Sequence, residues 1–449
     1  MSKQRIQLSD HFTYSRLLRF VLPCIGTMLF TSIYGIVDGL CVSNFVGKTA
    51  FAAVNLIMPL PMLLGTIGFM LGTGGSAIVG ITLGEGDQKK ADRYFTLFLL
   101  AALVSVSVLA VLGIVFLRPI AVLLGAKGEL LDYAVRYGRI LMVSLPTFAL
   151  QNMFQSFFVT AEKPHLGFWF TVGAGCTNMV LDVLMVGIWG WGVEGAAIAT
   201  FISQLVGGVL PVFYFIDRSN SSRLHLCKTS FYSKVLRDAC INGSSELMTN
   251  LSMSLVNILY NYQLLRLACE NGVAAYGVIM YAAFLFVAVF VGYAVGSAPI
   301  VSFHYGARNH AEVHNLYRKS LRLIAVVAVT LTLASMFIIP CVARIFVGYD
   351  AELLALTSRA FRLYALSFLI MGFNVYASSF FTALGDGVTS ALISFLRTLA
   401  FQVIAILLLP LLLGIDGIWL AVTAAELAAL AVSAAMLLTK DKVFHYRKA

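Results

Sequence analysis

The sequence predicts an all-α integral membrane protein. Of its 449 residues, 60% are hydrophobic and only 12% are charged, and the mean hydropathy is +0.89. A soluble globular chain carries about 25% charged residues, so this composition excludes an ordinary soluble enzyme. The net charge of +10 is dispersed along the chain, unlike the basic patch of a nucleic-acid-binding protein. We therefore expect the protein to lie among membrane lipids and to bind no nucleic acid.

Apolar stretches long enough to cross a bilayer occur twelve times along the chain. A membrane-crossing helix needs about 20 largely apolar residues, and charged residues or Gly and Pro turns bound each stretch. In chain order the first six are 17–42, 51–82, 94–117, 134–159, 167–190 and 195–216. The last six are 238–265, 274–304, 320–343, 359–383, 390–413 and 417–438.

One long polar connector, 217–237, divides the spans into two sets of six. Its run Arg218-Ser-Asn-Ser-Ser-Arg223 and the later basic residues cannot lie in lipid. We therefore predict an N-terminal six-helix lobe over 1–216, a cytoplasmic connector, and a C-terminal six-helix lobe over 238–449.

The distribution of Lys and Arg predicts the orientation of the chain. An even number of spans puts both termini on one side, and 21 of the 31 Lys and Arg residues fall on that side. Nine fall on the opposite side, and Arg397 lies inside a span. Basic residues are enriched in cytoplasmic loops, so we expect a multi-pass protein of the cytoplasmic (inner) membrane with both termini in the cytoplasm. The first apolar stretch is too long for the core of a cleavable signal peptide.

The two halves of the chain resemble each other at a spacing of 222 residues. At this shift Ile57-Met58 aligns with Ile279-Met280, and Gly192-Val-Glu-Gly195 aligns with Gly414-Ile-Asp-Gly417. Because six spans per half is an even number, the halves have the same orientation and are related by a pseudo-two-fold axis along the membrane normal. That arrangement is typical of transporters whose two bundles surround a central cavity; two copies of a purely structural bundle are the alternative.

Few ionisable residues lie inside the spans, and each needs a reason to be there, because a charge at the bilayer centre costs at least about 2.5 kcal/mol. They are Asp38, Asp182, Glu246, Arg397 and Glu426. Arg397 and Glu426 have opposite signs in neighbouring spans, so we expect them to pair. Glu246 stands near the start of the seventh span, where it is either a second protonatable site or an ordinary helix-end residue.

Asp182 and Asn178 are four residues apart and therefore share one face of a helix. If Asp38 from the first span meets them, two carboxylates and an amide converge in a medium of low dielectric. Such a group can bind a hard cation such as Na⁺ through oxygen atoms, or can hold a proton. In either case it is a candidate coupling site; the alternative is that each acid only links neighbouring helices.

These residues resemble the multidrug and toxic compound extrusion (MATE) family, nearer its MepA-like bacterial branch, over essentially the whole chain. The resemblance rests on the run from Pro23 to Asp38, on Asn178-Met-Val-Leu-Asp182, and on the segment Gly192 to Thr200. It implies two six-helix lobes in a V, and export of cationic, amphipathic drugs in exchange for H⁺ or Na⁺. It also implies that Asp38, Asn178, Asp182 and Thr200 bind the coupling cation and that Pro23 lets the first helix bend. No other cofactor or metal is expected.

Aromatic residues in several spans could line a substrate cavity and hold organic cations through their π faces. The set comprises Phe154, Phe157, Tyr281, Tyr376 and Phe380. We therefore predict a non-enzymatic, monomeric, cation-coupled antiporter for small organic cations. A lipid-linked oligosaccharide flippase of the same superfamily is the alternative, but it would need a strongly cationic cavity for pyrophosphate. An integral-membrane enzyme ranks third, because the helix ends lack an acid–base constellation.

Overall fold

The computed structural model describes residues 6–46, 48–348 and 350–447, apart from the side chains of residues 40–45, 48, 342, 345 and 346. The described chain is helical, without strands. Its first half contains α1 (Tyr14–Phe45), α2 (Lys48–Ile57), α3 (Pro59–Gly84), α4 (Gln88–Leu123), α5 (Gly128–Thr160), α6 (Pro164–Asp182), the π-helical turn η1 (Val183–Ile188), α7 (Gly192–Gly208) and α8 (Leu210–Ile216). Its second half contains α9 (Ser233–Asn242), α10 (Ser244–Gly306), α11 (His310–Val347), α12 (Ala351–Ala365), α13 (Phe368–Ala383), α14 (Gly387–Phe395), the π-helical turn η2 (Leu396–Ala400), α15 (Phe401–Leu413), α16 (Ile415–Thr439) and α17 (Asp441–Phe444).

Several of these helices join into single membrane spans. Two of these spans are interrupted at a proline, which lacks an N–H and cannot continue a regular helix. Pro59 begins α3 directly after α2, and Pro211 lies at the start of α8 after α7. Helices α12 and α13 form one span bent by 46°. Conversely, α10 contains two spans, since Ala268 and Cys269 have non-helical backbone angles and divide it.

The described helices account for the twelve predicted spans. Nine helical segments are long and apolar enough to cross a membrane, and the bent α12–α13 pair makes a tenth. Dividing α10 adds an eleventh, and α5 is the twelfth. Helix α5 has a lower hydropathy because it buries polar residues such as Gln151 and Asn152 among α3, α4 and α7. The prediction of an all-α membrane protein with twelve helices is confirmed.

The connector between the halves is shorter than predicted. Residues 217–232 are non-helical, but α9 begins at Ser233, inside the predicted connector 217–237. Helix α9 packs against α3 of the first half and α14 of the second. The seventh span therefore begins after the break at Gly243 instead of at residue 238. Apolar content alone could not separate a short amphipathic helix from the span that follows it.

Tight glycine contacts between the halves show the pseudo-two-fold axis directly. A Cβ at Gly84 would strike the carbonyl oxygen of Phe303, and a Cβ at Gly306 would strike the carbonyl oxygen of Ile81. The 222-residue shift relates Gly84 to Gly306 and Ile81 to Phe303, so the two contacts are symmetric copies of each other. The axis passes between the ends of α3 and α10 at this point. Only glycine allows the two backbones to approach so closely.

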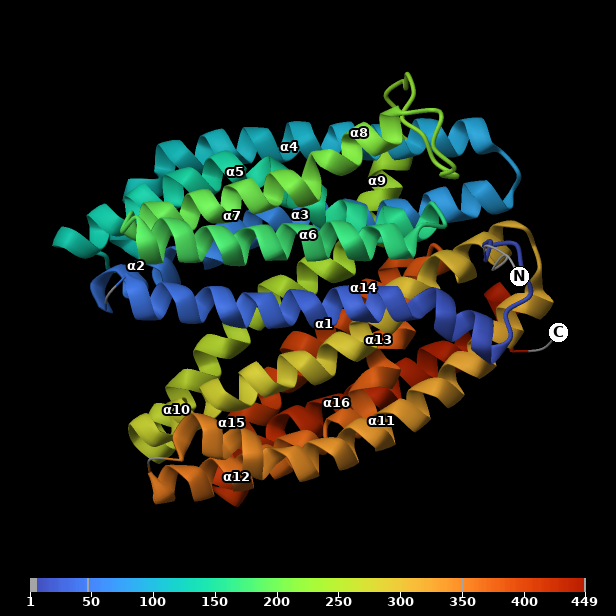
Figure 1. The fold of residues 1–449 in the computed structure, drawn as a ribbon. Helices are drawn as coiled ribbons and strands as arrows, with labels where there is room; N and C mark the ends of the chain where they lie inside the picture. Colours follow the sequence, from blue (N-terminus) through green and yellow to red (C-terminus); the bar gives the residue numbers. More distant parts are fainter. Residues whose placement is uncertain (1–5, 47, 349, 448–449) are drawn as a thin grey trace.

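The two lobes meet at the end of the molecule that carries both termini and separate toward the opposite end (Figure 1). We call these the terminal end and the far end. Helix α1 lies between the lobes, packing on α6 of the first half and α10 of the second. The largest apolar core includes Leu8, Phe20, Leu83, Ile300 and Phe303, and so joins both halves at the terminal end. The molecule is thus a V that is closed at the terminal end.

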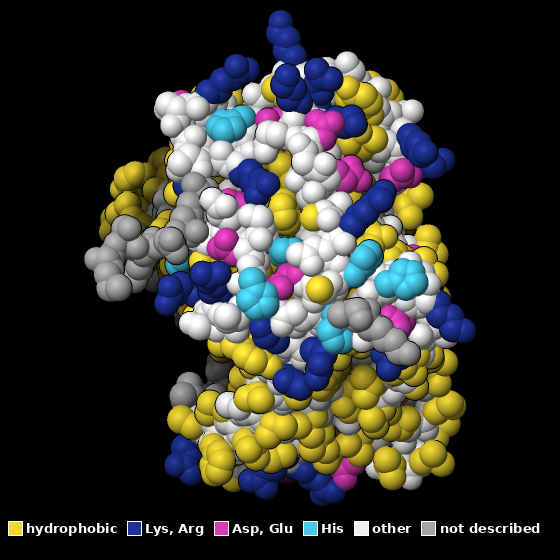
Figure 2. All heavy atoms as spheres, turned by 90° about the vertical axis from the view of Figure 1, so that its right-hand side faces the viewer, with side chains coloured by type: hydrophobic (Ala, Val, Ile, Leu, Met, Phe, Trp, Pro, Cys, Tyr) yellow, Lys and Arg dark blue, Asp and Glu magenta, His cyan; other side chains and the backbone are white. Residues whose placement is uncertain are grey.

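Residues 6–13, which we call the N-terminal strap, cross this closed end. The side chains of Leu8 and Phe12 are fully buried. Glu162 of the first half accepts a hydrogen bond from the Leu8 N–H at 3.0 Å, and Glu312 of the second half accepts one from the Phe12 N–H at 2.9 Å. His11 also contacts Glu312. Figure 2 looks onto this end, where Lys and Arg side chains lie among Asp, Glu and His.

Repeat-related ion pairs link helices within each lobe. Arg136 on α5 pairs with Glu194 at the start of α7 at 3.6 Å, and Arg359 on α12 pairs with Asp416 at the start of α16. These pairs give Glu194 and Asp416 a structural role. Six of the seven cysteines are free, and Cys41 lies outside the described side chains.

Candidate functional site

Helices α1 and α6 pack side by side in parallel, and their contacts set the register of the candidate coupling site. Gly26 lies against the ring of Phe168, and further along Gly175 lies against Phe30 and Tyr34. The small glycines let the two helices approach closely. Continuing each helix by two turns from the Gly175 contact brings Asp38 and Asp182 to the same level.

The carboxyl groups of Asp38 and Asp182 face each other at interacting distance across these helices. Asp182 is fully buried, Asn178 is 2% exposed, and Asp38 is half-buried. Asn178 lies one turn before Asp182 on the same face of α6. The structure therefore brings together three of the four residues that the sequence predicts for the coupling site.

The polar atoms of this group lack ordinary partners. Among the described residues, neither carboxyl oxygen of Asp182 and neither amide atom of Asn178 forms a hydrogen bond. Buried polar groups are nearly always hydrogen-bonded, so each exception needs an explanation. Two facing carboxylates in a low-dielectric medium also repel each other. A bound proton or a small cation would relieve both penalties, and carboxylate and amide oxygens are suitable ligands for a hard cation.

The surroundings of the pair are phenolic and irregular. Tyr137 of α5 is buried within electrostatic range of both carboxyl groups, and Tyr34 lies within range of Asp38. The π-helical turn η1 follows directly after Asp182, and such turns are frequent at functional sites. Thr200 is half-buried on α7, which packs against both α6 and η1. Its backbone carbonyl accepts a hydrogen bond from the Ser203 hydroxyl at 2.8 Å.

Pro23 lies inside α1, which is continuous from Tyr14 to Phe45 in this conformation. A proline inside a helix removes one backbone hydrogen bond and weakens the helix locally. The Thr27 hydroxyl donates to the Pro23 carbonyl at 2.9 Å, a hydrogen bond to the backbone four residues earlier that often accompanies helix bending. The sequence-level interpretation of Pro23 as a bending position stays a prediction.

A cavity of about 770 Å³ lies between the lobes, a volume typical of sites for drug-sized ligands. Helices α3 and α5 contribute Thr73, Ser76 and Ser156, but most of the lining comes from the second half. The aromatic part of the wall consists of Tyr260, Tyr276, Tyr281, Phe284 and Tyr364. Five methionines add flexible, polarizable surface; they are Met58, Met62, Met253, Met280 and Met371.

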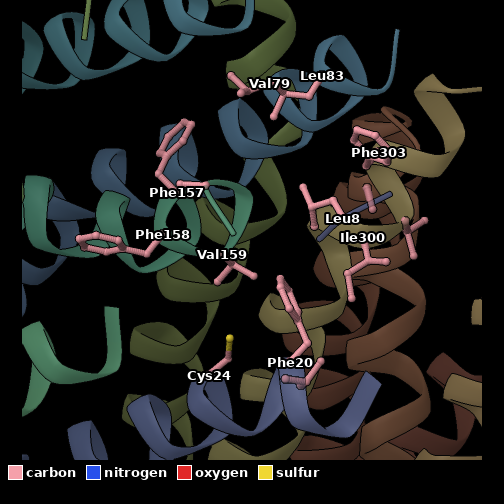
Figure 3. Close-up of a cluster of buried hydrophobic side chains, with 14 of the residues drawn as sticks. Leu8, Phe20, Cys24, Val79, Leu83, Phe157, Phe158, Val159, Ile300 and Phe303 are labelled. Atoms are coloured by element: carbon pink, nitrogen blue, oxygen red, sulfur yellow. The ribbon is translucent and has the colours of Figure 1, made fainter. Parts of the chain in front are cut away.

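Of the aromatic residues predicted to line a cavity, only Tyr281 does so in this conformation. Phe154, Phe157, Tyr376 and Phe380 are at most 2% exposed and belong to the main core. Phe157 packs among buried side chains in Figure 3, and its ring lies 4.8 Å from that of Phe95. The prediction for these four residues is thus corrected: ring–ring contacts among helices of their own lobe bury them.

The second lobe holds a buried ion pair at the cavity. Arg397 in η2 donates from Nε to Glu426 Oε1 at 2.8 Å, and their side chains are 13% and 1% exposed. Asn374 donates to the other Glu426 oxygen at 2.7 Å, and its own amide oxygen accepts from Ser433 at 2.9 Å. The predicted pairing of Arg397 with Glu426 is confirmed. The network satisfies both Glu426 oxygens, as a buried carboxylate requires.

Glu246 lies in the first turn of α10 and lines the same cavity, within electrostatic range of Arg397. Its carboxyl group forms no hydrogen bond or ion pair among the described residues. The two lobes are therefore unlike: the first holds the facing pair Asp38 and Asp182, and the second holds three charged groups on a cavity wall.

A sequence model of the MatE family matches this chain twice, over residues 23–184 and over residues 247–408. The two matches begin at related points of the internal repeat and together cover more than half of the chain. The chain belongs to the MatE family. The first match runs from Pro23 past Asp182, and the second contains Arg397 and begins one residue after Glu246.

Curated relatives of this MatE chain include proteins named multidrug export protein MepA. The relative from Staphylococcus saprophyticus is 20% identical over 434 residues, covering 96% of this chain and 95% of its own length. One from Staphylococcus aureus is 21% identical over 433 residues, with the same coverage. The alignment thus spans both lobes and the connector between them.

Solved MATE structures share the fold over its whole length. A MATE transporter in complex with MaL6 is 22% identical, with full coverage of both chains and a TM-score of 0.92. A multidrug resistance MATE family transporter in an outward-facing conformation has the same identity, coverage and TM-score. A MOP superfamily transporter from Pyrococcus furiosus, also 22% identical, reaches 0.90. The MatE fold of twelve helices in two lobes is therefore established for this multi-pass membrane protein.

Some residues of the MatE chain's sites carry no signal in the sequence. Asn374 binds Glu426, and Tyr137 lies beside the facing carboxyl groups. Both occur in ordinary polar or aromatic positions of apolar spans, so no local pattern marks them. Glu162 and Glu312 lie close to helix ends, where acidic residues are common, so the sequence does not distinguish them either.

Proposed function

We propose that this chain is a cation-coupled antiporter that exports cationic, amphipathic drugs and other toxic organic compounds. The relatives named multidrug export protein support the export function. The observation that carries the coupling mechanism is the pair of facing carboxyl groups, Asp38 and Asp182, beside the unpartnered amide of Asn178. H⁺ or Na⁺ is the proposed coupling ion.

The pair would work through its charge. Without a bound ion, two ionised carboxylates repel each other in a low-dielectric medium, and α1 and α6 are pushed apart at that level. Binding of H⁺ or Na⁺ removes the repulsion and draws the two helices together. Because Pro23 weakens α1 about four turns away from Asp38, we propose that α1 bends on ion binding and that cargo is then released. Thr200 on the adjacent helix α7 is the fourth proposed ligand.

The orientation of transport follows from the V shape. Twenty-one of the 31 basic residues lie on the side of the termini, which supports a cytoplasmic location for both termini in the cytoplasmic membrane. The terminal end is closed by the glycine contacts and the N-terminal strap. On this assignment the structure corresponds to an outward-facing state, and alternate opening of the two ends carries cargo outward. We propose that one chain suffices, with organic cations as cargo and lipids as surroundings.

The charge of the cavity argues against the alternative function. A flippase for lipid-linked oligosaccharides would need a cationic cavity that holds a pyrophosphate. The charged residues lining this cavity are Glu246, Glu426 and Arg397, so the described lining carries a net negative charge. A drug cation is favoured by that charge and a pyrophosphate is repelled.

Membrane vesicles with an imposed ion gradient test the proposal. We expect ethidium or norfloxacin transport driven by ΔpH or ΔNa⁺, and the gradient that drives it identifies the ion. Asp38→Asn and Asp182→Asn should each abolish coupled transport, because a neutral amide neither repels its neighbour nor takes up a proton. Asp132→Asn, an exposed acid of the same lobe, is the matched control and should keep transport. Unchanged transport in Asp38→Asn would remove the coupling site.

A further inference from the structure

Three charged groups on the cavity wall of the second lobe have no role in the ion coupling proposed above. Glu246 comes from the first turn of α10, Arg397 from η2, and Glu426 from the middle of α16. All three line the cavity between the lobes. A charge in a membrane protein usually has a pairing partner or a function, so the distribution of partners among the three groups is informative.

Glu426 is fully committed to structure. One of its oxygens accepts from Arg397 Nε at 2.8 Å, and the other accepts from Asn374 at 2.7 Å. Its side chain is 1% exposed. It therefore neutralises Arg397 and fixes the guanidinium plane, but has no oxygen left for a ligand.

Arg397 keeps donors that point elsewhere. The hydrogen bond to Glu426 uses only Nε, and the described residues offer no acceptor to its two terminal nitrogens. A guanidinium has five N–H groups, and the side chain is 13% exposed on the cavity wall. Its terminal N–H groups are thus available to a carboxylate, which an Arg fork binds with two parallel hydrogen bonds.

Glu246 is the complementary group. It lies in the first turn of α10, at the positive end of the helix dipole. It is within electrostatic range of Arg397, but no ion pair within 4.0 Å joins the two among the described residues. A negative and a positive group therefore line the same cavity without pairing with each other. The hydroxyl groups of Thr249, Ser378 and Thr398 and the amide of Asn250 are also on that wall.

We propose that Glu246 and Arg397 form a dipolar recognition site for zwitterionic amphipathic compounds, with an ammonium group at Glu246 and a carboxylate at the terminal nitrogens of Arg397. The aromatic and methionine surface of the same cavity receives the apolar part of the molecule. Because Glu426 cancels the charge of Arg397, a simple organic cation also binds, through Glu246 alone. A simple anion is excluded. This inference rests on the proposed export function for the identity of the cavity as the cargo site.

A pair of dyes with the same ring system tests the site. Rhodamine 6G is an esterified cation, and its free acid is a zwitterion at neutral pH. Equilibrium binding of each dye to the purified full-length protein is measured by fluorescence anisotropy. We expect Glu246→Gln to weaken both dyes at least about tenfold, since truncating one partner of a partly buried charge pair has effects of this size or larger. Glu270→Gln, an exposed acid of the same helix outside the cavity, should bind both normally.

The second variant removes the positive group without leaving a buried charge. Arg397→Met combined with Glu426→Gln leaves the net charge of the cavity wall unchanged, and Gln can still accept from Asn374. We expect this double variant to bind the free acid about tenfold more weakly and the ester as before. An unchanged ratio of the two affinities in the double variant, normal binding in Glu246→Gln, or a wild-type protein that binds neither dye would overturn the proposal. Dye binding as expected without ion-driven transport would instead overturn the antiport function and leave the site standing.

Discussion

Replacing Glu312 by Gln should release the N-terminal strap from the terminal end. The Glu312 side chain is 7% exposed. It accepts hydrogen bonds from the Phe12 N–H at 2.9 Å and from Asn315 at 2.8 Å, and contacts His11 Nδ1 at 2.6 Å. A hydrogen bond to a charged group is worth about 1.5–3 kcal/mol and a neutral one about 1 kcal/mol. Gln keeps the size of the side chain but not its charge.

Two of these bonds hold the strap itself, and each loses about 0.5–2 kcal/mol, so the substitution removes about 1–4 kcal/mol from strap binding. Each 1.4 kcal/mol is a factor of ten in an equilibrium constant, and the open strap should become about 5 to 1,000 times more populated. Because Leu8 and Phe12 are fully buried between the lobes, their release also exposes apolar surface and weakens the closed terminal end.

Hydrogen–deuterium exchange of the strap amides measures this change. We expect the N–H groups of residues 8–12 to lose protection in Glu312→Gln, while amides in the middle of α5 exchange as before. Glu352→Gln, an exposed acid in the first turn of α12, is the matched control and should change nothing. Strap protection within threefold of the wild type in Glu312→Gln would refute the view that this carboxylate anchors the strap.

Three further perturbations act on the interface, an ion pair and a helix cap. Gly84→Ala places a Cβ against the backbone of α10, and such overpacking costs about 1–3 kcal/mol. Spin labels on α4 and α11 should therefore report a wider terminal end by pulsed EPR. An unaltered distance between the labels would contradict this expectation. Arg397→Met alone leaves Glu426 buried and unpaired, which costs about 3–5 kcal/mol of stability. Adding Glu426→Gln should restore most of the thermal stability. Equal melting temperatures of the single and double variants would show that the unpaired Glu426 carries no such cost. Burial raises the pKa of Asp386, but hydrogen bonds from Lys440 and Thr389 outweigh it and hold this pKa below its usual value. Their contribution is complete above about pH 4 and is lost as the pH falls through the lowered pKa, so Lys440→Met should cost about 0.5–1 kcal/mol at pH 7 and much less near pH 3; a melting difference independent of pH would argue against the pair.

The chain's two lobes illustrate how a repeated fold can carry different chemistry. The glycine contacts at Gly84 and Gly306 and the ion pairs at Arg136 and Arg359 recur in both halves. The acidic pair at Asp182 does not recur, and the related span of the second half instead carries Arg397 in η2. Both of these spans contain a π-helical turn at their charged residue: η1 follows Asp182 directly, and η2 contains Arg397. Structure has therefore been kept symmetric, while the charged sites differ between the lobes.

The sequence predicted features that depend on local pattern. Span lengths, the internal repeat and the shared helix face of Asn178 and Asp182 all follow from apolar runs and helical periodicity, which act over a few residues. The pairing of Arg397 with Glu426 was also predictable, because opposite charges in lipid have few other partners. The span boundary near Gly243 was not, since a short amphipathic helix and the start of a span have similar composition.

By itself, then, the sequence determined a membrane protein of two six-helix repeats with isolated acids in its spans, because the cost of burying charge and backbone in lipid leaves few other solutions. Only the tertiary structure decided which distant residues meet. It placed Asp38 against Asp182 through the packing of α1 on α6, buried Phe157 in the core instead of the cavity, and seated the strap on Glu162 and Glu312. Such contacts join residues more than 60 positions apart, and an aromatic or acidic side chain has the same local pattern whichever neighbour it finally contacts.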